Sequence, residues 1–410
     1  MRFSTLFLIV SLISLLLLPT IKGDTYSGLS SSLIPHLEWN RTWEKNESVG
    51  EVKIGTGNNG DIFVGGGTSW TKPSALLLSY DTSGKNLWNK TWTKGTMSQV
   101  LGMAIDDEER IYITIGSDAD GGLYCYDSSG NYNWSKNVSG FYKSVICSSN
   151  SLFIAGGNND NASIVRLNLS GNVSWDKEYD TGVYETINGI TLAHDNRTIY
   201  GTGIIGSKYG QKDVLIVAYD INGTYKWSKT WGGSSEDSGT GIAVDSNNNV
   251  YVCGWTESYG VGINDVLLLK YDSTGNFKWY KTWGTVIADD GNGICIHNDS
   301  IYITGSTDTD AILLKYNTSG TLQWNTTWRT VNIQISHDVY VNKSGEIYVA
   351  GSLSYTTGTP MYIYILKYIE VPDGAPEFVT ILLPIATVIA LFVIVTIRKR
   401  RKRDLYERNY

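Results

Sequence analysis

The chain has 410 residues, a formal net charge of −7, 14 tryptophans and 44 glycines. This length allows one large domain or two to three domains of ordinary size. The acidic balance argues against nucleic acid as a partner, because phosphate binding depends on clustered lysine and arginine.

The first 23 residues have the pattern of a secretory signal peptide. Arg2 precedes an apolar stretch from Leu6 to Leu18, and small residues follow up to Gly23. We therefore expect residues 1–23 to direct export and to be removed.

A repeated unit occupies most of the remaining chain. Its clearest copy is YDSTGNFKWYKTW, Tyr271–Trp283, and its tryptophan recurs at 41 to 52 residue intervals. The recurring positions are Trp88, Trp134, Trp175, Trp227, Trp279 and Trp324. This spacing is typical of a four-stranded propeller blade, with the variation placed in loops.

One unit, Gly239–Trp283, illustrates the predicted strands. Three runs rich in β-branched and aromatic residues are separated by polar turns, and a tryptophan-bearing strand closes the unit. Asp272 and Gly275 predict a tight hairpin before that last strand. Trp279 and Trp283 share one face of the strand, so we expect them to pack blade against blade rather than to bind sugars.

The two ends of the repeat complement each other. The last unit has its first three strands but lacks the tryptophan strand after Tyr368, whereas Leu37–Trp43 supplies such a strand at the N-terminus. Pairing them would close the ring. The predicted fold is all-β: a seven-bladed β-propeller of four-stranded blades closed by the N-terminal strand, with one C-terminal transmembrane helix.

The C-terminal region has the composition of a membrane anchor. We expect the propeller at 24–370, a stalk at 371–377, a transmembrane helix at 378–397 and a basic cytoplasmic tail at 398–410. The basic run RKRRKR favours a single-pass protein of the cell membrane with an extracellular propeller.

Glycosylation sequons and cysteines agree with export. Asn-X-Ser/Thr occurs at Asn40, Asn46, Asn89, Asn133, Asn137, Asn161, Asn168, Asn172, Asn196, Asn222, Asn298, Asn317, Asn325 and Asn342. The four cysteines, Cys125, Cys147, Cys253 and Cys295, form no CxxC pair, and we expect small buried residues rather than disulfides.

The segment Gly232–Trp283 resembles the SBBP-type β-propeller repeat of secreted prokaryotic proteins. It carries GIAVD, then VYVCG, a variable loop, and D-hydrophobic-KYD-x-x-G-x-x-x-W. The resemblance extends over residues 37–368 and implies a propeller without common catalytic residues. The C-terminal APEFVTILLPIATVIALFVIVTIRKRRKR is similar to archaeal PEF-type sorting signals. That similarity implies an archaeal protein whose span is either retained or removed by a sortase-like protease.

D-x-x-G-x-x-x-W also resembles the tryptophan-docking repeat of quinoprotein dehydrogenases. Those enzymes have eight blades and bind a quinone beside a metal ion, often with adjacent cysteines. This chain has seven units, no adjacent cysteines and no recognised catalytic motif. We therefore expect no enzyme activity and no cofactor, with a quinone- or metal-dependent surface oxidoreductase as the alternative.

Two groups of acidic residues are candidate ligand sites. Asp118/Asp120 and Asp308/Asp310 are spaced carboxylates in polar loops, which predict either calcium ligands or solvated turns. On the innermost strands, the aligned position is Gly102, Ser144, Gly189, Gly241 and Gly293, but Asp338 and Glu51 in the last and first units. We expect this position to face the channel. Glu51 and Asp338, with His337 beside them, are then either a site for a cation or basic ligand at the channel mouth or solvated pore carboxylates.

The predicted function is recognition or adhesion on a cell surface. Long variable loops fall on the face that carries the connections between second and third strands and between blades, where loops are free to carry binding. The expected ligand is an unidentified extracellular protein or glycan. The other alternative is a purely structural component of the cell envelope.

Overall fold

The computed structural model describes residues 33–47, 50–68, 74–93, 98–116, 121–138, 140–158, 160–206, 211–354 and 361–373. Pro35–Glu370 forms one compact unit. The predicted signal peptide, transmembrane span and basic tail lie outside the described residues. No helix in the described part is long and apolar enough to span a membrane.

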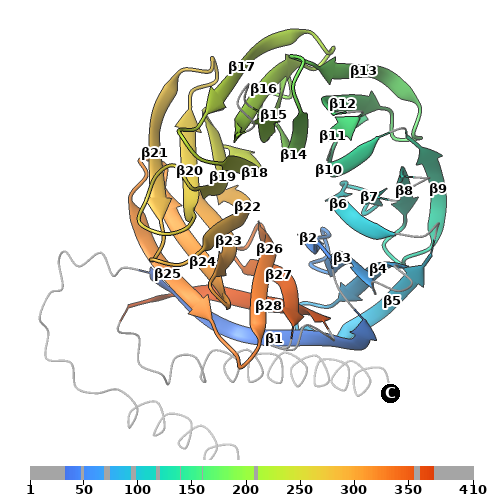
Figure 1. The fold of residues 1–410 in the computed structure, drawn as a ribbon. Helices are drawn as coiled ribbons and strands as arrows, with labels where there is room; N and C mark the ends of the chain where they lie inside the picture. Colours follow the sequence, from blue (N-terminus) through green and yellow to red (C-terminus); the bar gives the residue numbers. More distant parts are fainter. Residues whose placement is uncertain are drawn as a thin grey trace, which may run out of the picture. The chain divides into compact units, whose positions relative to one another are not determined.

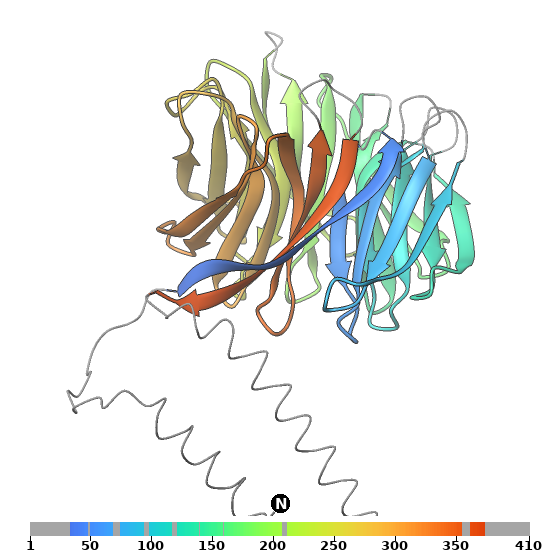
Figure 2. The same ribbon diagram turned by 90° about the horizontal axis from the view of Figure 1, so that it is seen from below.

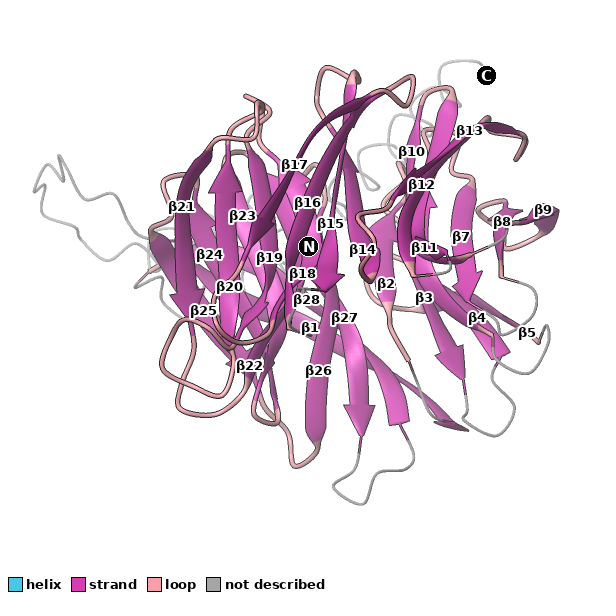
Figure 3. Cartoon of the chain, turned by 45° about the horizontal axis from the view of Figure 1, so that its top comes forward, coloured by secondary structure: helices cyan, strands magenta, loops and turns pink. Residues whose placement is uncertain are grey.

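The described elements are antiparallel strands joined by turns and loops, as Figure 3 shows. Four sheets each use four consecutive strands. They are β10 (Phe141–Ser148), β11 (Ser151–Asn158), β12 (Asn161–Leu167) and β13 (Val173–Tyr179); β14 (Glu185–Leu192), β15 (Thr198–Gly206), β16 (Lys212–Asp220) and β17 (Tyr225–Trp231); β18 (Asp237–Val244), β19 (Val250–Thr256), β20 (Asp265–Tyr271) and β21 (Phe277–Trp283); and β22 (Asp289–His297), β23 (Ser300–Thr307), β24 (Asp310–Asn317) and β25 (Leu322–Trp328).

The remaining strands form two sheets. The first contains β2 (Lys53–Thr56), β3 (Ile62–Thr68), β4 (Ser74–Tyr80), β5 (Asn86–Trp92), β6 (Gln99–Ile105), β7 (Ile111–Gly116), β8 (Gly122–Tyr126) and β9 (Tyr132–Asn137). Its two halves meet at the pair Gly67–Gln99 of β3 and β6. The other contains β26 (Ile333–Val341), β27 (Ile347–Ser354), β28 (Met361–Pro372) and β1 (Leu33–Glu47).

The sheets stand around a ring with β2, β6, β10, β14, β18, β22 and β26 innermost (Figure 1). The middle strands are buried on both faces: β20 has one partly exposed residue, whereas the outer strand β21 is mostly exposed. Neighbouring sheets cover both faces of a middle strand, which explains why these strands are continuous apolar runs instead of alternating ones.

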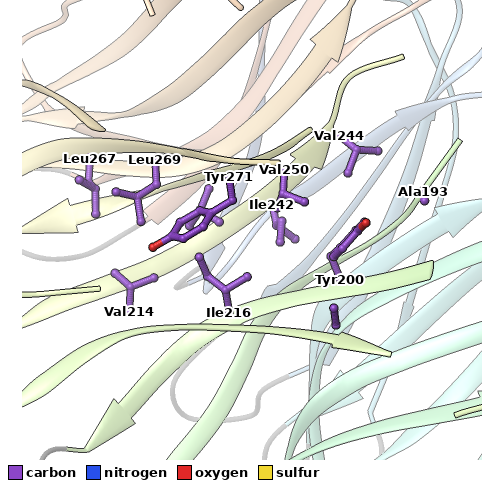
Figure 4. Close-up of a cluster of buried hydrophobic side chains, with 12 residues drawn as sticks. Ala193, Tyr200, Val214, Ile216, Ile242, Val244, Val250, Leu267, Leu269 and Tyr271 are labelled. Atoms are coloured by element: carbon purple, nitrogen blue, oxygen red, sulfur yellow. The ribbon is translucent and has the colours of Figure 1, made fainter. Parts of the chain in front are cut away.

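The core lies between consecutive sheets. Figure 4 shows one such cluster, in which Val214 and Ile216 of β16 lie across from Leu267 and Leu269 of β20. Trp227 and Trp231 pack against the edge of the same cluster. Burial of such side chains stabilises a fold by about 1.5–3 kcal/mol each.

The tryptophan of one sheet packs on the turn that precedes the outer strand of the next sheet. Asp272 Oδ1 accepts the N–H groups of Thr274 and Asn276 at 3.0 and 2.9 Å, and Gly275 has φ +82°. Trp227 Nε1 donates to the carbonyl of Ser273 at 3.3 Å. A Cβ on Gly275 would lie 2.8 Å from the Trp227 ring. The prediction that the tryptophans pack one blade against the next is confirmed.

The N-terminal strand completes the last sheet, as the sequence predicted: β1 pairs with β28 (Figure 2). Trp39 and Trp43 pack against the cluster that contains Tyr348 and Ile363. The four cysteines are all free, as expected. Cys125 and Cys253 are buried, whereas Cys147 and Cys295 are only partly so.

Candidate functional site

A polar cavity lies among the innermost strands. Its volume is about 170 Å³, and its walls are Glu51, Lys53, Lys143, Asn188, Thr240, Asn292 and His337. Lys143, Asn188, Thr240, Asn292 and His337 are each the extra residue of a one-residue register shift in the inner strand. A bulge residue leaves the strand ladder and re-aims its side chain, here toward the cavity.

Hydrogen bonds between neighbouring blades fix these bulge residues. Asn188 Nδ2 donates to the carbonyl of Gly239 at 2.8 Å, and Thr240 Oγ1 donates to that of Gly291 at 2.7 Å. Asn292 Nδ2 donates in the same way to Ser336 at 2.9 Å. Each bond crosses from one blade to the next, so the cavity wall is held in place by the ring itself.

The aligned glycine position does not face the channel, and this corrects the sequence interpretation. A Cβ on Gly189 would lie 3.2 Å from the Cα of Gly241, and one on Gly293 would lie 2.9 Å from the Cα of Asp338. The position therefore faces the next blade. It is small because the inner strands approach so closely that a larger side chain would clash.

Asp338 connects the last blade to the first. Its Oδ2 accepts the N–H of Ile54 at 3.0 Å, and its Oδ1 accepts the N–H of Val339 at 3.0 Å. Burial raises the pKa of Asp338, against the opposing effect of Lys53. This carboxyl is absent from the cavity wall, unlike its neighbours Glu51 and His337.

Glu51 and His337 do line the cavity, but neither leaves a free anionic site. Glu51 Oε2 pairs with Lys53 Nζ at 3.3 Å. Burial raises the pKa of Glu51, yet Lys53, His337 and Lys143 outweigh it and hold the pKa below its usual value. His337 Nε2 lies 2.9 Å from Ser352 Oγ, and burial lowers the pKa of His337 to about 4, so the ring is neutral at pH 7.

The sequence interpretation missed Lys53 and Lys143. Lys143 Nζ donates to Asn188 Oδ1 at 2.8 Å, and burial, reinforced by Lys53, lowers the pKa of Lys143. Two ammonium groups and one carboxylate therefore face the cavity, which overturns the expectation of an acidic pair. The available signal was a polar residue directly before the aligned small residue, as in Lys143-Ser144 and Asn188-Gly189.

The spaced acids predicted as calcium ligands have different surroundings. Asp308 is exposed with φ 50°, whereas Asp310 is buried and pairs with Arg329. Asp118 and Asp120 lie outside the described residues. Within the described ranges, no group of three or more His, Cys, Asp or Glu residues is arranged to hold a metal ion.

Pairs of carboxylates meet at one end of the ring, which we call the loop face: the end with the connections between second and third strands and between blades. A Cβ on Gly284 would lie 2.1 Å from Asp265 Oδ1 and 2.9 Å from Asp289 Oδ2. Asp289 is fully buried; its Oδ2 accepts the N–H of Thr285 at 2.6 Å, and its Oδ1 has no hydrogen-bond partner among the described residues. Thus two carboxylates converge on a position without a side chain.

The same arrangement recurs one blade earlier. A Cβ on Gly232 would lie 2.0 Å from Asp213 Oδ1 and 2.9 Å from Asp237 Oδ2. Burial, and the charge of Asp237, raise the pKa of Asp213.

One blade later, the glycine is replaced by Arg329. Its guanidinium pairs with Asp310, the equivalent of Asp265, and Gln334 replaces the second carboxylate. Asp310 is only 3% exposed, yet Arg329 reaches it from a largely exposed position. The chain thus supplies its own cation at one of three equivalent positions.

Exposed apolar side chains gather in the same loops. Val261 and Ile263 precede β20, Val286 follows β21, and Val331 follows β25; their exposed fractions are 72, 67, 79 and 90%. We call these four residues the apolar rim. Beside it, the rings of Trp231, Tyr259 and Tyr280 pack mutually, with centroids 5.0 to 5.4 Å apart. Gathered exposed side chains of this kind are typical of interaction surfaces.

Ten of the predicted sequon asparagines are exposed. They are Asn40, Asn89, Asn133, Asn137, Asn168, Asn172, Asn196, Asn222, Asn298 and Asn325. Asn342 is half-buried, and its Nδ2 donates to Glu346 Oε2 at 2.6 Å. That amide nitrogen is the atom a glycan would occupy, so half-burial and this hydrogen bond both oppose glycosylation of Asn342.

Two family signatures match parts of the chain. The one described as "Beta-propeller repeat" (SBBP) matches residues 226–260, and the one described as "Outer membrane protein assembly factor BamB" (PQQ_2) matches residues 74–209. Each covers less than half of the chain. A search of curated proteins gives no significant match.

Solved structures with the same architecture include two eukaryotic propellers. The Neurospora crassa Pan2 WD40 domain is similar with a TM-score of 0.55 at 12% identity, covering 85% of this chain and 98% of that domain. The Myceliophteria thermophila Cps50 (Swd1) β-propeller domain has a TM-score of 0.53 at 8% identity, covering 80% and 99%. Such identities show the fold alone. Together with the repeat signatures, they make this chain a β-propeller repeat protein.

Proposed function

We propose that the chain is a cell-surface interaction module that binds a protein partner through its loop face. The observation that carries this proposal is the site around Gly284, where Asp265 and Asp289 converge without a cation beside the apolar rim. Because the chain fills the equivalent position with Arg329, the chemistry that fits is a guanidinium or ammonium group.

The proposed partner therefore presents an arginine or lysine flanked by apolar side chains. The basic group would enter beside Gly284, and Val261, Ile263 and Val286 would contact the apolar neighbours. Loop N–H groups already donate to the Oδ2 atoms of Asp265 and Asp289. Buried carboxylates would still give specificity in such an interface, because a partner without the cation would cover them without supplying an opposite charge.

Surface display is part of the proposal. It is supported by the signal-like residues 1–23, the apolar segment 378–397 with the basic run after it, and the exposed sequons. The proposed propeller has seven blades, counting the two halves of the eight-stranded sheet separately since one residue pair joins them. The stalk would carry this ring outside the cell.

The proposal that the partner inserts a basic group can be tested by placing an arginine of the chain itself at Gly284. In Gly284→Arg the new guanidinium is expected to pair with Asp265, as Arg329 pairs with Asp310, and to block the partner's basic group. The measurement is quantitative co-purification from native membranes, comparing wild type, Gly284→Arg and Ser129→Arg. Ser129 is exposed in the β8–β9 turn at the opposite end of the ring, so that variant adds the same charge elsewhere.

The expected result is a protein lost with Gly284→Arg and retained with Ser129→Arg. Binding by that protein should also weaken when its basic residues are neutralised. If both variants recover the same proteins as wild type, the loop face around Gly284 is not the binding surface.

Glycopeptide mapping on intact cells tests surface display separately. Occupied sequons on the outer strands, such as Asn89 and Asn325, are expected, with Asn342 empty because its amide is engaged. A chain without any glycan, found inside the cell, would contradict export.

A further inference from the structure

The cavity at the ring centre contains a cation, Lys143, that forms no ion pair with the described residues. Lys143 Nζ has one hydrogen-bond partner among the described residues, the neutral Oδ1 of Asn188 at 2.8 Å. An ammonium group has three donors, and Lys143 is only partly buried, so water or a bound anion can accept from the remaining two. The charge on Lys143 is therefore incompletely satisfied by the protein.

The other charges around the cavity do not supply what Lys143 lacks. Glu51 pairs with Lys53 at 3.3 Å, and it favours the charged form of Lys143 without forming an ion pair with it. Asp338 is committed to the backbone N–H groups of Ile54 and Val339. His337 lies beside Ser352 and carries no negative charge in any protonation state. The remaining wall residues are neutral amides and a hydroxyl, so the side chains that line the cavity have an excess of one positive charge, while Asp338, outside the wall, acts on Lys53.

The size of the cavity limits what can compensate for that charge. Its volume is about 170 Å³. Since each water molecule in the liquid takes about 30 Å³, this space corresponds to about six waters. A small oxyanion of a few non-hydrogen atoms fits, whereas a nucleotide or a sugar chain does not.

We propose that this cavity binds a small oxyanion, either a short carboxylate or inorganic phosphate, between the ammonium groups of Lys143 and Lys53. Asn188 and Asn292 each use one N–H to bridge to the next blade. The second N–H of each amide is available to the anion. Glu51 keeps the excess charge of the wall at one, which matches a singly charged anion such as a carboxylate or the dihydrogen form of phosphate. The site lies on the innermost strands and is independent of the loop-face proposal.

Binding of acetate and of phosphate to the full chain in detergent, measured by calorimetry, tests this inference. One of them is expected to bind saturably, and Lys143→Gln should weaken that binding by about tenfold or more, as for the loss of one charge-assisted hydrogen bond. Lys136→Gln is the matched control, because Lys136 is exposed on the outer strand β9. Lys143→Arg should restore most of the affinity.

The two probes also distinguish the ligand classes. Preference for acetate assigns a carboxylate, and preference for phosphate assigns a phosphoryl group. The proposal is overturned if neither anion binds with a Kd below about 10 mM, if chloride competes equally well, or if Lys143→Gln and Lys136→Gln behave alike. A thermal melt without added anion confirms that Lys143→Gln is folded before the comparison is made.

Discussion

The junctions between ordinary blades and the junction where the ring closes are built from different groups. At an ordinary junction, Trp227 lies on the turn that contains Gly275, and the inner strands approach glycine to glycine. On the two sides of the closing blade, charged side chains join these contacts. Trp324 Nε1 donates to Glu370 Oε1 of β28 at 2.9 Å instead of to a turn carbonyl. On the other side, Trp39 still donates to the carbonyl of Thr82 at 3.4 Å, and Arg41 donates to the carbonyl of Gly84 at 2.7 Å.

The difference shows what a repeat can and cannot encode. A repeated unit supplies the same hydrophobic and backbone contacts at each junction, whereas the ends of the chain need unique residues. Glu370 also pairs with Lys315 at 2.6 Å, with side chains only 15 and 11% exposed. Ionic contacts of this kind are specific but depend on both partners.

Removing the closing strand should have the largest effect. A chain lacking residues 24–43 would leave the edge of β28 unpaired and expose the cluster around Tyr348. We expect a sharp fall in the thermal midpoint and aggregation, measured by calorimetry and light scattering. An unchanged midpoint would mean that β1 does not close the ring in solution.

Glu370→Gln should reveal the ionic character of this blade. The variant can still accept a hydrogen bond from Trp324, but it leaves Lys315 without its counter-charge. We expect a loss of about 3 kcal/mol in the free energy of unfolding. Urea denaturation provides the measurement, and a loss below about 1 kcal/mol would put this pair among ordinary surface ion pairs.

Gly275→Ala and Gly345→Ala separate backbone strain from the tryptophan contact. Both glycines have φ +82°, but a Cβ on Gly275 meets Trp227 at 2.8 Å, whereas one on Gly345 meets nothing within 4 Å. Strain alone should cost about 1 kcal/mol at each site, and the contact should add about 1–2 kcal/mol at Gly275. Equal losses would show that the ring of Trp227 moves aside freely.

His337 makes stability depend on pH at the closing junction. Because its pKa is about 4 in the folded chain and 6.5 in the reference state, the unfolded chain binds the proton first as pH falls. This contribution to stability should therefore decrease from about pH 6.5 down to about pH 4, by roughly 3 kcal/mol, and be constant above that range. His337→Gln should remove this part of the pH dependence, whereas Asn292→Gln, at the equivalent bulge of an ordinary blade, should leave it unchanged.

The architecture could be predicted from sequence because its signals are local and repeated. The pattern from Asp272 through Gly275 to Trp279 specifies a turn, a backbone conformation and a packing contact within eight residues. Closure was also predictable, since Leu37–Trp43 is the strand that the last unit lacks.

The channel could not be predicted in the same way. The prediction of which side chains face the channel assumes that they alternate along the strand with a period of two. A bulge, such as those at Asn188 and Thr240, inserts one residue and reverses that alternation. Gly189 was therefore assigned to the wrong face, and Lys143 was overlooked. Glu370 lies beyond the repeat, so no alignment between units could identify its role.

The pairing of β1 with β28 also sets an order of events during synthesis. β1 is the first propeller strand to be made, and its partner β28 is the last. While the intervening blades are produced, β1 has no partner, and its free edge is a site for pairing with other chains. Completion of the ring is thus a late step that requires contacts between the two ends of the sequence, which are the slowest contacts to form.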